Sequence, residues 1–119
     1  MIKTLLLVTS LLEAAFGIFV LVAPGLAYSL LFGGAAAPSA LIMARVYGIA
    51  LIGLGIACYP PGVRQGYYGM LAYGMLVALY LVIVGTAGTA GILLWPAVVV
   101  HLLLSAALIV AGRAAQTKP

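Results

Sequence analysis

Residues 4–23 read TLLLVTSLLEAAFGIFVLVA, and this stretch decides the fold class because Glu13 is its only charged side chain. An α-helix needs about 20 mostly apolar residues to cross the hydrocarbon core of a bilayer. The run ends at Pro24-Gly25, which cannot continue a regular helix. Glu13 and the proline after Ala23 also disfavour a cleaved signal peptide, so we expect a retained transmembrane helix.

Three further stretches have a similar length and composition. They cover residues 39–59, 67–86 and 92–112. Pro60-Pro61-Gly62 and the glycines of segment 85–91 mark the turns between them. We therefore predict an all-α integral membrane protein, an antiparallel bundle of four transmembrane helices in a single domain, residues 1–119.

The overall composition agrees with lipid as the solvent. Hydrophobic residues make up 67% of the chain and charged residues only 5%, whereas a soluble domain has about 25% charged residues. The net charge of +4 does not indicate nucleic-acid binding, because the basic residues are scattered singly and form no patch. They are Lys3, Arg45, Arg64, Arg113 and Lys118.

The basic residues also predict the topology. Four spans put both termini and the middle loop on one side of the membrane, and every basic residue except Arg45 falls there. The loops at about 24–38 and 87–91 carry no charge. The positive-inside rule therefore predicts cytoplasmic termini in a bacterial inner membrane.

The first outer loop is itself apolar. Residues 25–32 read GLAYSLLF, which is too short to span, and Gly33-Gly34 follow. We expect a short helix that lies in the membrane interface.

Each predicted span has one face of small or polar residues at helical spacing. Small residues allow helix backbones to approach closely within a membrane. The glycines predicted to pack helices together are Gly17, Gly48, Gly55 and Gly69.

Glu13, Arg45 and His101 are the ionisable residues inside the predicted spans. A charge at the bilayer centre costs roughly 2.5–3.5 kcal/mol on insertion scales, so such residues are functional candidates. We predict a Glu13–Arg45 ion pair between the first two spans. The pair either fixes helix register or lines a site or route. The predicted intramembrane polar network is completed by His101, Tyr73, Tyr80 and Ser105.

The sequence does not indicate an enzyme. His101 and Ser105 share a helix face and Glu13 is an acid, but no nucleophile elbow or oxyanion loop accompanies them. The single Cys58, the single histidine and the single acid lack any metal-ligand spacing. The glycines do not form a phosphate loop. We predict no metal site, and the sequence identifies no cofactor.

Three segments carry a resemblance: LEAAFG at 12–17, ARVYG at 44–48 and GILLWPAVVVH at 91–101. On these segments, which extend over nearly the whole chain, the protein resembles an uncharacterised family of small four-helix bacterial integral membrane proteins. The resemblance implies the four-helix layout and points to Glu13, Arg45 and His101. It implies no activity, because the family has none established.

Three functions remain open from the sequence. We favour a small structural or accessory membrane protein, a subunit of a larger complex, with other membrane subunits or further copies of itself as partners. One alternative is a small oligomeric transporter or channel that uses Glu13. The other is a binding module for a lipid, quinone or pigment between helices, because such pockets combine apolar walls with a few polar groups.

Overall fold

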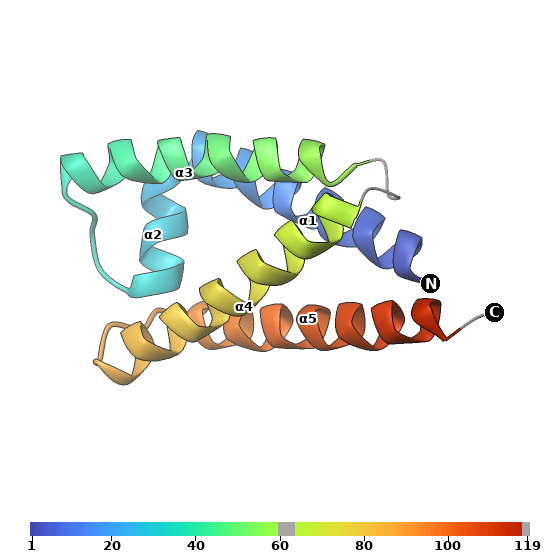
Figure 1. Ribbon diagram of the computed structural model, residues 1–119. Helices are drawn as coiled ribbons and strands as arrows, with labels where there is room; N and C mark the ends of the chain where they lie inside the picture. The colour runs from blue at the N-terminus through green and yellow to red at the C-terminus, as the bar shows by residue number, and fades with distance from the viewer. Residues whose placement is uncertain (60–63, 118–119) are drawn as a thin grey trace.

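The computed structural model describes residues 1–59 and 64–117, and these residues form five helices (Figure 1). In chain order they are α1 (Ile2–Val22), α2 (Pro24–Phe32), α3 (Pro38–Ala57), α4 (Arg64–Thr86) and α5 (Leu94–Gln116). The predicted all-α class is therefore confirmed for the described part of the chain.

Four of the helices, all but α2, are long and apolar enough to cross a membrane. They contain 20 to 23 residues each, or about 30–35 Å of helix. Their bounds differ from the expected spans mainly at two places, because α4 begins at Arg64 and α5 continues to Gln116. The predicted stop at Pro60-Pro61-Gly62 lies outside the described residues, as does Lys118.

Helices α1 and α3 pack through their glycines. A Cβ atom added at Gly17 would lie 2.7 Å from the Gly48 carbonyl oxygen, and one at Gly55 would lie 2.6 Å from the Ser10 carbonyl oxygen. Only hydrogen fits at these distances, so the two backbones are in direct contact. Ser10, in the first half of α1, meets Gly55 near the end of α3, whereas Gly17 meets Gly48. The residue numbers in contact therefore fall along α3 as they rise along α1.

Helices α4 and α5 form the second close pair. Gly74 lies against the Ser105 hydroxyl, and Gly85 lies against Leu94 and Trp95. Near the chain termini, the Tyr67 hydroxyl donates a hydrogen bond of 3.1 Å to the Leu108 carbonyl. In this pair too, residues early in α4 contact residues late in α5, and residues late in α4 contact residues early in α5.

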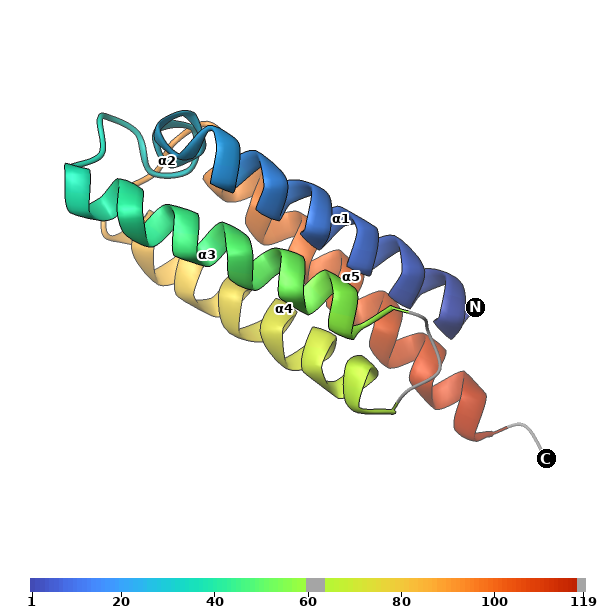
Figure 2. The same ribbon diagram turned by 90° about the horizontal axis from the view of Figure 1, so that it is seen from above.

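The short helix α2 lies across the bundle. It runs nearly perpendicular to α3 in Figure 1 and is seen along its axis in Figure 2. The last carbonyls of a helix have no partner within it. Those of Leu30 and Leu31 accept bonds of 2.8 Å from the amides of Leu93 and Gly91. The turn before α5 therefore caps α2 and fixes its position.

The buried core is divided between the two ends of the bundle. One cluster, at the end that holds both termini, contains Leu6, Cys58, Met70 and Leu108. The other, near α2, contains Leu81, Leu94 and Val98. Large apolar side chains are otherwise exposed on all four long helices. Leu81 of the second cluster also lines the cavity of the candidate site.

Candidate functional site

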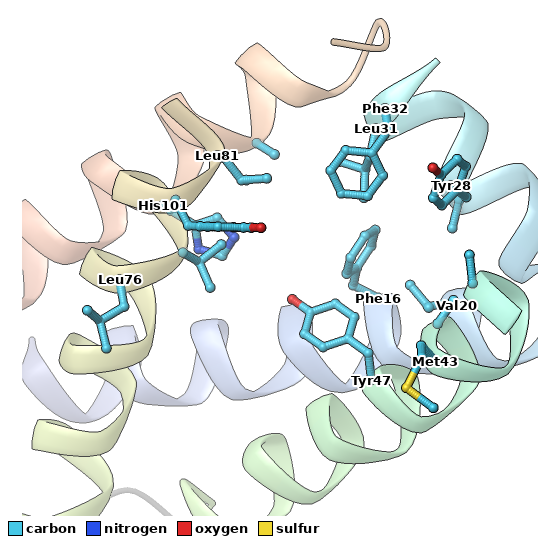
Figure 3. A pocket seen from close by; sticks show the side chains of 16 residues that line it. Phe16, Val20, Tyr28, Leu31, Phe32, Met43, Tyr47, Leu76, Leu81 and His101 are labelled. Atoms are coloured by element: carbon cyan, nitrogen blue, oxygen red, sulfur yellow. The ribbon is translucent and has the colours of Figure 1, made fainter. Parts of the chain in front are cut away.

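A cavity of about 670 Å³ lies between the α1–α3 pair and the α4–α5 pair (Figure 3). All five helices contribute to its wall. The lining residues are Phe16 and Val20 of α1, Ala27, Tyr28, Leu31 and Phe32 of α2, Ala40, Met43, Ala44 and Tyr47 of α3, Leu76, Val77, Tyr80 and Leu81 of α4, and Ala97 and His101 of α5. The wall is almost entirely apolar, and the cavity is not fully enclosed.

The local sequence explains the shape of the cavity. In Figure 1, α3 and α4 diverge toward the end that holds α2. Ala40, Ala44 and Tyr47 follow one another at intervals of four and three residues, so they share one face of α3. The two alanines leave space, and Tyr28 and Phe32 of α2 cover that end with aromatic rings.

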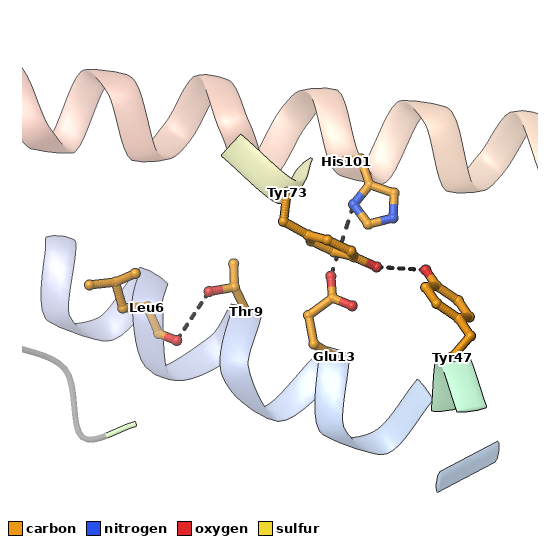
Figure 4. A network of polar contacts seen from close by, with 6 residues as sticks. All are labelled: Leu6, Thr9, Glu13, Tyr47, Tyr73 and His101. Atoms are coloured by element: carbon orange, nitrogen blue, oxygen red, sulfur yellow. Dashed lines mark hydrogen bonds and ion pairs between the residues drawn. The ribbon is translucent and has the colours of Figure 1, made fainter. Parts of the chain in front are cut away.

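A polar cluster lies beside the cavity (Figure 4). Oε1 of Glu13 lies 3.9 Å from Nδ1 of His101. The hydroxyls of Tyr47 and Tyr73 are hydrogen-bonded at 2.8 Å, and either can be the donor. The Tyr73 ring packs edge-on against His101, with ring centroids 5.7 Å apart. Four helices, α1, α3, α4 and α5, therefore meet through these side chains.

The cluster touches the cavity through only two of its members. Tyr47 and His101 line the cavity, whereas Glu13 and Tyr73 do not. Glu13 is only 7% exposed. The carboxyl group is thus set behind His101 and the tyrosine pair, and a molecule in the cavity would meet the hydroxyl of Tyr47 and the imidazole first.

The predicted Glu13–Arg45 ion pair is wrong, because Arg45 is exposed and Glu13 faces His101 instead. The register of α1 against α3 gives the reason. Gly17 meets Gly48 and Ser10 meets Gly55, so Glu13 lies opposite residue 52 or beyond. Arg45 is at least seven residues from that point, toward the start of α3, which corresponds to about 10 Å along the helix axis.

Of the other two members of the predicted network, Tyr80 lies apart from the polar cluster and Ser105 lies beside it. Tyr80 lines the cavity but is 65% exposed, and the tyrosine that bonds Tyr73 is Tyr47. Ser105 is buried and lies in a small void that Glu13, Tyr73 and His101 also line. Of the predicted network, the structure therefore brings Glu13, Tyr73, His101 and Ser105 together.

Three of the four glycines predicted to pack helices together do so. Gly17, Gly48 and Gly55 lie in the contact between α1 and α3. The expectation does not hold for Gly69, because no atom lies within 4 Å of a Cβ added there. Gly74, five residues further along α4, contacts Ser105 of α5 instead.

Tyr47 belongs to the site but is not among the site residues predicted from the sequence. A signal was available, because a tyrosine well inside a span does not belong to the belt of aromatic residues at the membrane surface. Its spacing from Ala44 on one side and Leu51 on the other places it on the inward half of the helix.

Among the described residues, no three His, Cys, Asp or Glu side chains come close enough to hold a metal ion. Comparison of the chain with protein-family models, curated proteins and solved structures gave no match. Its function is therefore inferred from the site.

Proposed function

We propose that this chain is an integral membrane protein that crosses the bilayer four times as an antiparallel bundle and binds a lipophilic molecule in the cavity. Four helices of spanning length support the membrane assignment. The apolar side chains exposed on all of them would form a very large apolar surface in water. In lipid the same surface is in contact with hydrocarbon.

The proposed orientation places both termini in the cytoplasm. Lys3 is in the first turn of α1. Figure 1 shows the start of α1, the end of α5 and the start of α4 at the same end of the bundle. Arg64 and Arg113 belong to that end as well. The positive-inside rule supports a cytoplasmic location for it. Helix α2, across the other end, would then lie parallel to the outer membrane surface.

The observation that carries the binding function is the cavity itself. Ligand pockets have volumes of about 300–1,000 Å³ and apolar walls with a few polar groups. This cavity matches that description in volume, in its apolar wall and in its few polar side chains, which are Tyr28, Tyr47, Tyr80 and His101. The cavity is not fully enclosed, so a lipophile can enter it.

A pair of tryptophan variants on one helix tests the proposal. Ala44 lines the cavity, and Ala50 is exposed on α3 outside it. Protein is extracted from its native membrane with mild detergent, and bound small molecules are identified by mass spectrometry after organic extraction. We expect a stoichiometric lipophile in the parent chain and in Ala50→Trp, and its loss in Ala44→Trp. Equal recovery from both variants would contradict a ligand in the cavity.

The accessory-subunit function remains a second proposal. One observation favours it: Gly53 of α3 and Gly69 of α4 have open space where a side chain would be, and small residues on an outer face suit a further helix. Native mass spectrometry of the gently extracted particle tests it. Stoichiometric larger proteins would support a subunit, and a bare monomer or homo-oligomer would reject it.

Transport by an oligomer has weaker support. Glu13 is the buried acid such a mechanism would use, but it lies behind His101 and Tyr73 rather than on the cavity wall. Loss of transport in Glu13→Gln, for a substrate found by extraction, would favour it.

A further inference from the structure

We propose that the ligand is an uncharged lipophile with an apolar chain and a single carbonyl or hydroxyl head, and that Tyr47 and His101 bind this head. This inference rests on the proposed binding function and specifies its ligand class. Three features of the site support it. They are the positions of Tyr47 and His101, the hydrogen bond between Tyr47 and Tyr73, and the lack of lysine and arginine among the described lining residues.

Tyr47 and His101 approach the cavity from different helices. Tyr47 comes from α3 and His101 from α5 (Figure 3), and Tyr73 contacts both of them. Nδ1 of the imidazole is on the Glu13 side, and the second ring nitrogen points away from Glu13 (Figure 4). Tyr28 and Tyr80 also line the cavity, but only Tyr47 and His101 belong to the polar cluster, and the rest of the wall is nearly all hydrocarbon. A ligand with one polar end and a long apolar part satisfies both kinds of surface.

The hydrogen bond between Tyr47 and Tyr73 makes the head-group site adaptable. If Tyr73 donates in this bond, the Tyr47 proton is available to a ligand carbonyl. If Tyr47 donates, its oxygen can accept from a ligand hydroxyl, and Tyr73 directs its own proton elsewhere. Since a hydroxyl is both a donor and an acceptor and the 2.8 Å bond permits either direction, both head groups fit.

The charge distribution excludes ionic heads. No lysine or arginine is among the described residues that line the cavity, so an anionic head would be buried without a partner. Glu13 has His101 beside it and is separated from the cavity, so it does not offer a direct contact to a cationic head. Burying an unpaired charge in an apolar site is strongly unfavourable. An uncharged polar group avoids this cost.

Four probes of equal chain length test the ligand class: dodecane, 2-dodecanone, dodecanoate and dodecylammonium. Each is added to protein in lipid nanodiscs, and bound copies are counted by native mass spectrometry after the protein is released. We expect 2-dodecanone to bind more tightly than the other three. Tighter binding of either ion would overturn the inference.

Tyrosine variants identify the group that binds the head. Tyr47→Phe keeps the ring and removes the hydroxyl, and we expect it to weaken 2-dodecanone binding about three- to tenfold, the effect of one neutral hydrogen bond. Binding of dodecane should not change, which also shows that the variant is folded. The matched control is Tyr68→Phe, because Tyr68 is exposed and outside the cavity.

The outcomes separate this inference from the proposed function. If dodecane and 2-dodecanone bind equally and Tyr47→Phe changes neither, the cavity binds lipophiles but recognises no head group, and only the inference is overturned. If none of the four probes binds, the proposed function is overturned with it.

Discussion

His101 of α5 faces Glu13 of α1, with Nδ1 and Oε1 3.9 Å apart. These are the only acid and the only histidine of the chain, and they join the first and the last helix. The same histidine packs against Tyr73 and lines the cavity. His101 therefore connects the packing of the bundle with the proposed ligand.

We predict that Glu13 and His101 are coupled in stability. His101→Leu should lower the free energy of unfolding by about 1–3 kcal/mol, because it leaves a buried carboxyl group without this neighbour. Adding Glu13→Leu should recover much of the loss, since apolar replacement of both members of a buried polar pair is often tolerated. A double-mutant cycle, with unfolding followed in mixed micelles, measures the coupling. Strictly additive effects would show that the two side chains do not interact.

Two glycines on α3 should respond in opposite ways to alanine. At Gly48 the new Cβ would lie 2.7 Å from a backbone oxygen of α1, so we expect Gly48→Ala to destabilise by about 1–3 kcal/mol, as overpacking does. At Gly53 nothing lies within 4 Å, so Gly53→Ala should be neutral or stabilise by about 0.5–1 kcal/mol through backbone entropy. Thermal unfolding in one detergent compares the two variants. A Gly48→Ala protein as stable as its parent would mean that α1 and α3 are further apart.

The helical organisation was predictable because it depends on local composition. A run of apolar residues that ends at Pro24 specifies a helix and its end without reference to any partner. Gly17 and Gly48 could also be assigned to helix contacts, since small residues matter for packing wherever they occur in such helices. The exact ends were less predictable, because α5 continues as far as Gln116 through residues that favour helix but no longer suit the bilayer centre.

The arrangement of the candidate site could be predicted only in part. Charge pairing suggested Arg45 as the partner of Glu13, yet the pairing depends on helix register, and register is determined by the glycine contacts of α1 with α3. Likewise the sequence predicts Tyr73 in the network, but not its hydrogen-bond partner Tyr47, which lies on α3, 26 residues earlier in the chain. Small residues such as Ala40 and Ala44 contribute to the cavity, but its wall combines residues of all five helices, so its position depends on tertiary packing that no single span specifies.

The cap of α2 should be visible in hydrogen exchange. The amides of Gly91 and Leu93 donate to the last turn of α2, so we expect both to exchange much more slowly than an amide in an open loop. Gly91→Ala should abolish this protection, because its Cβ would contact the Leu30 backbone. Thr89→Ala, two residues earlier in the chain and exposed, is the control. Fast exchange at Gly91 in the parent chain would show that α2 is not attached to this turn.

The topology predicts which residues a membrane-impermeant thiol reagent reaches. In a Cys58→Ala background, a cysteine at Ala35 in the segment between α2 and α3 should be labelled from the outside of intact cells, because we place that segment on the outer surface. A cysteine at Ala115, near the end of α5 that we propose to be cytoplasmic, should be labelled only after the cells are opened. Both positions are exposed, so a difference in labelling reports sidedness and not burial. The reverse pattern would place the basic end of the bundle outside and would contradict the orientation drawn from Lys3, Arg64 and Arg113.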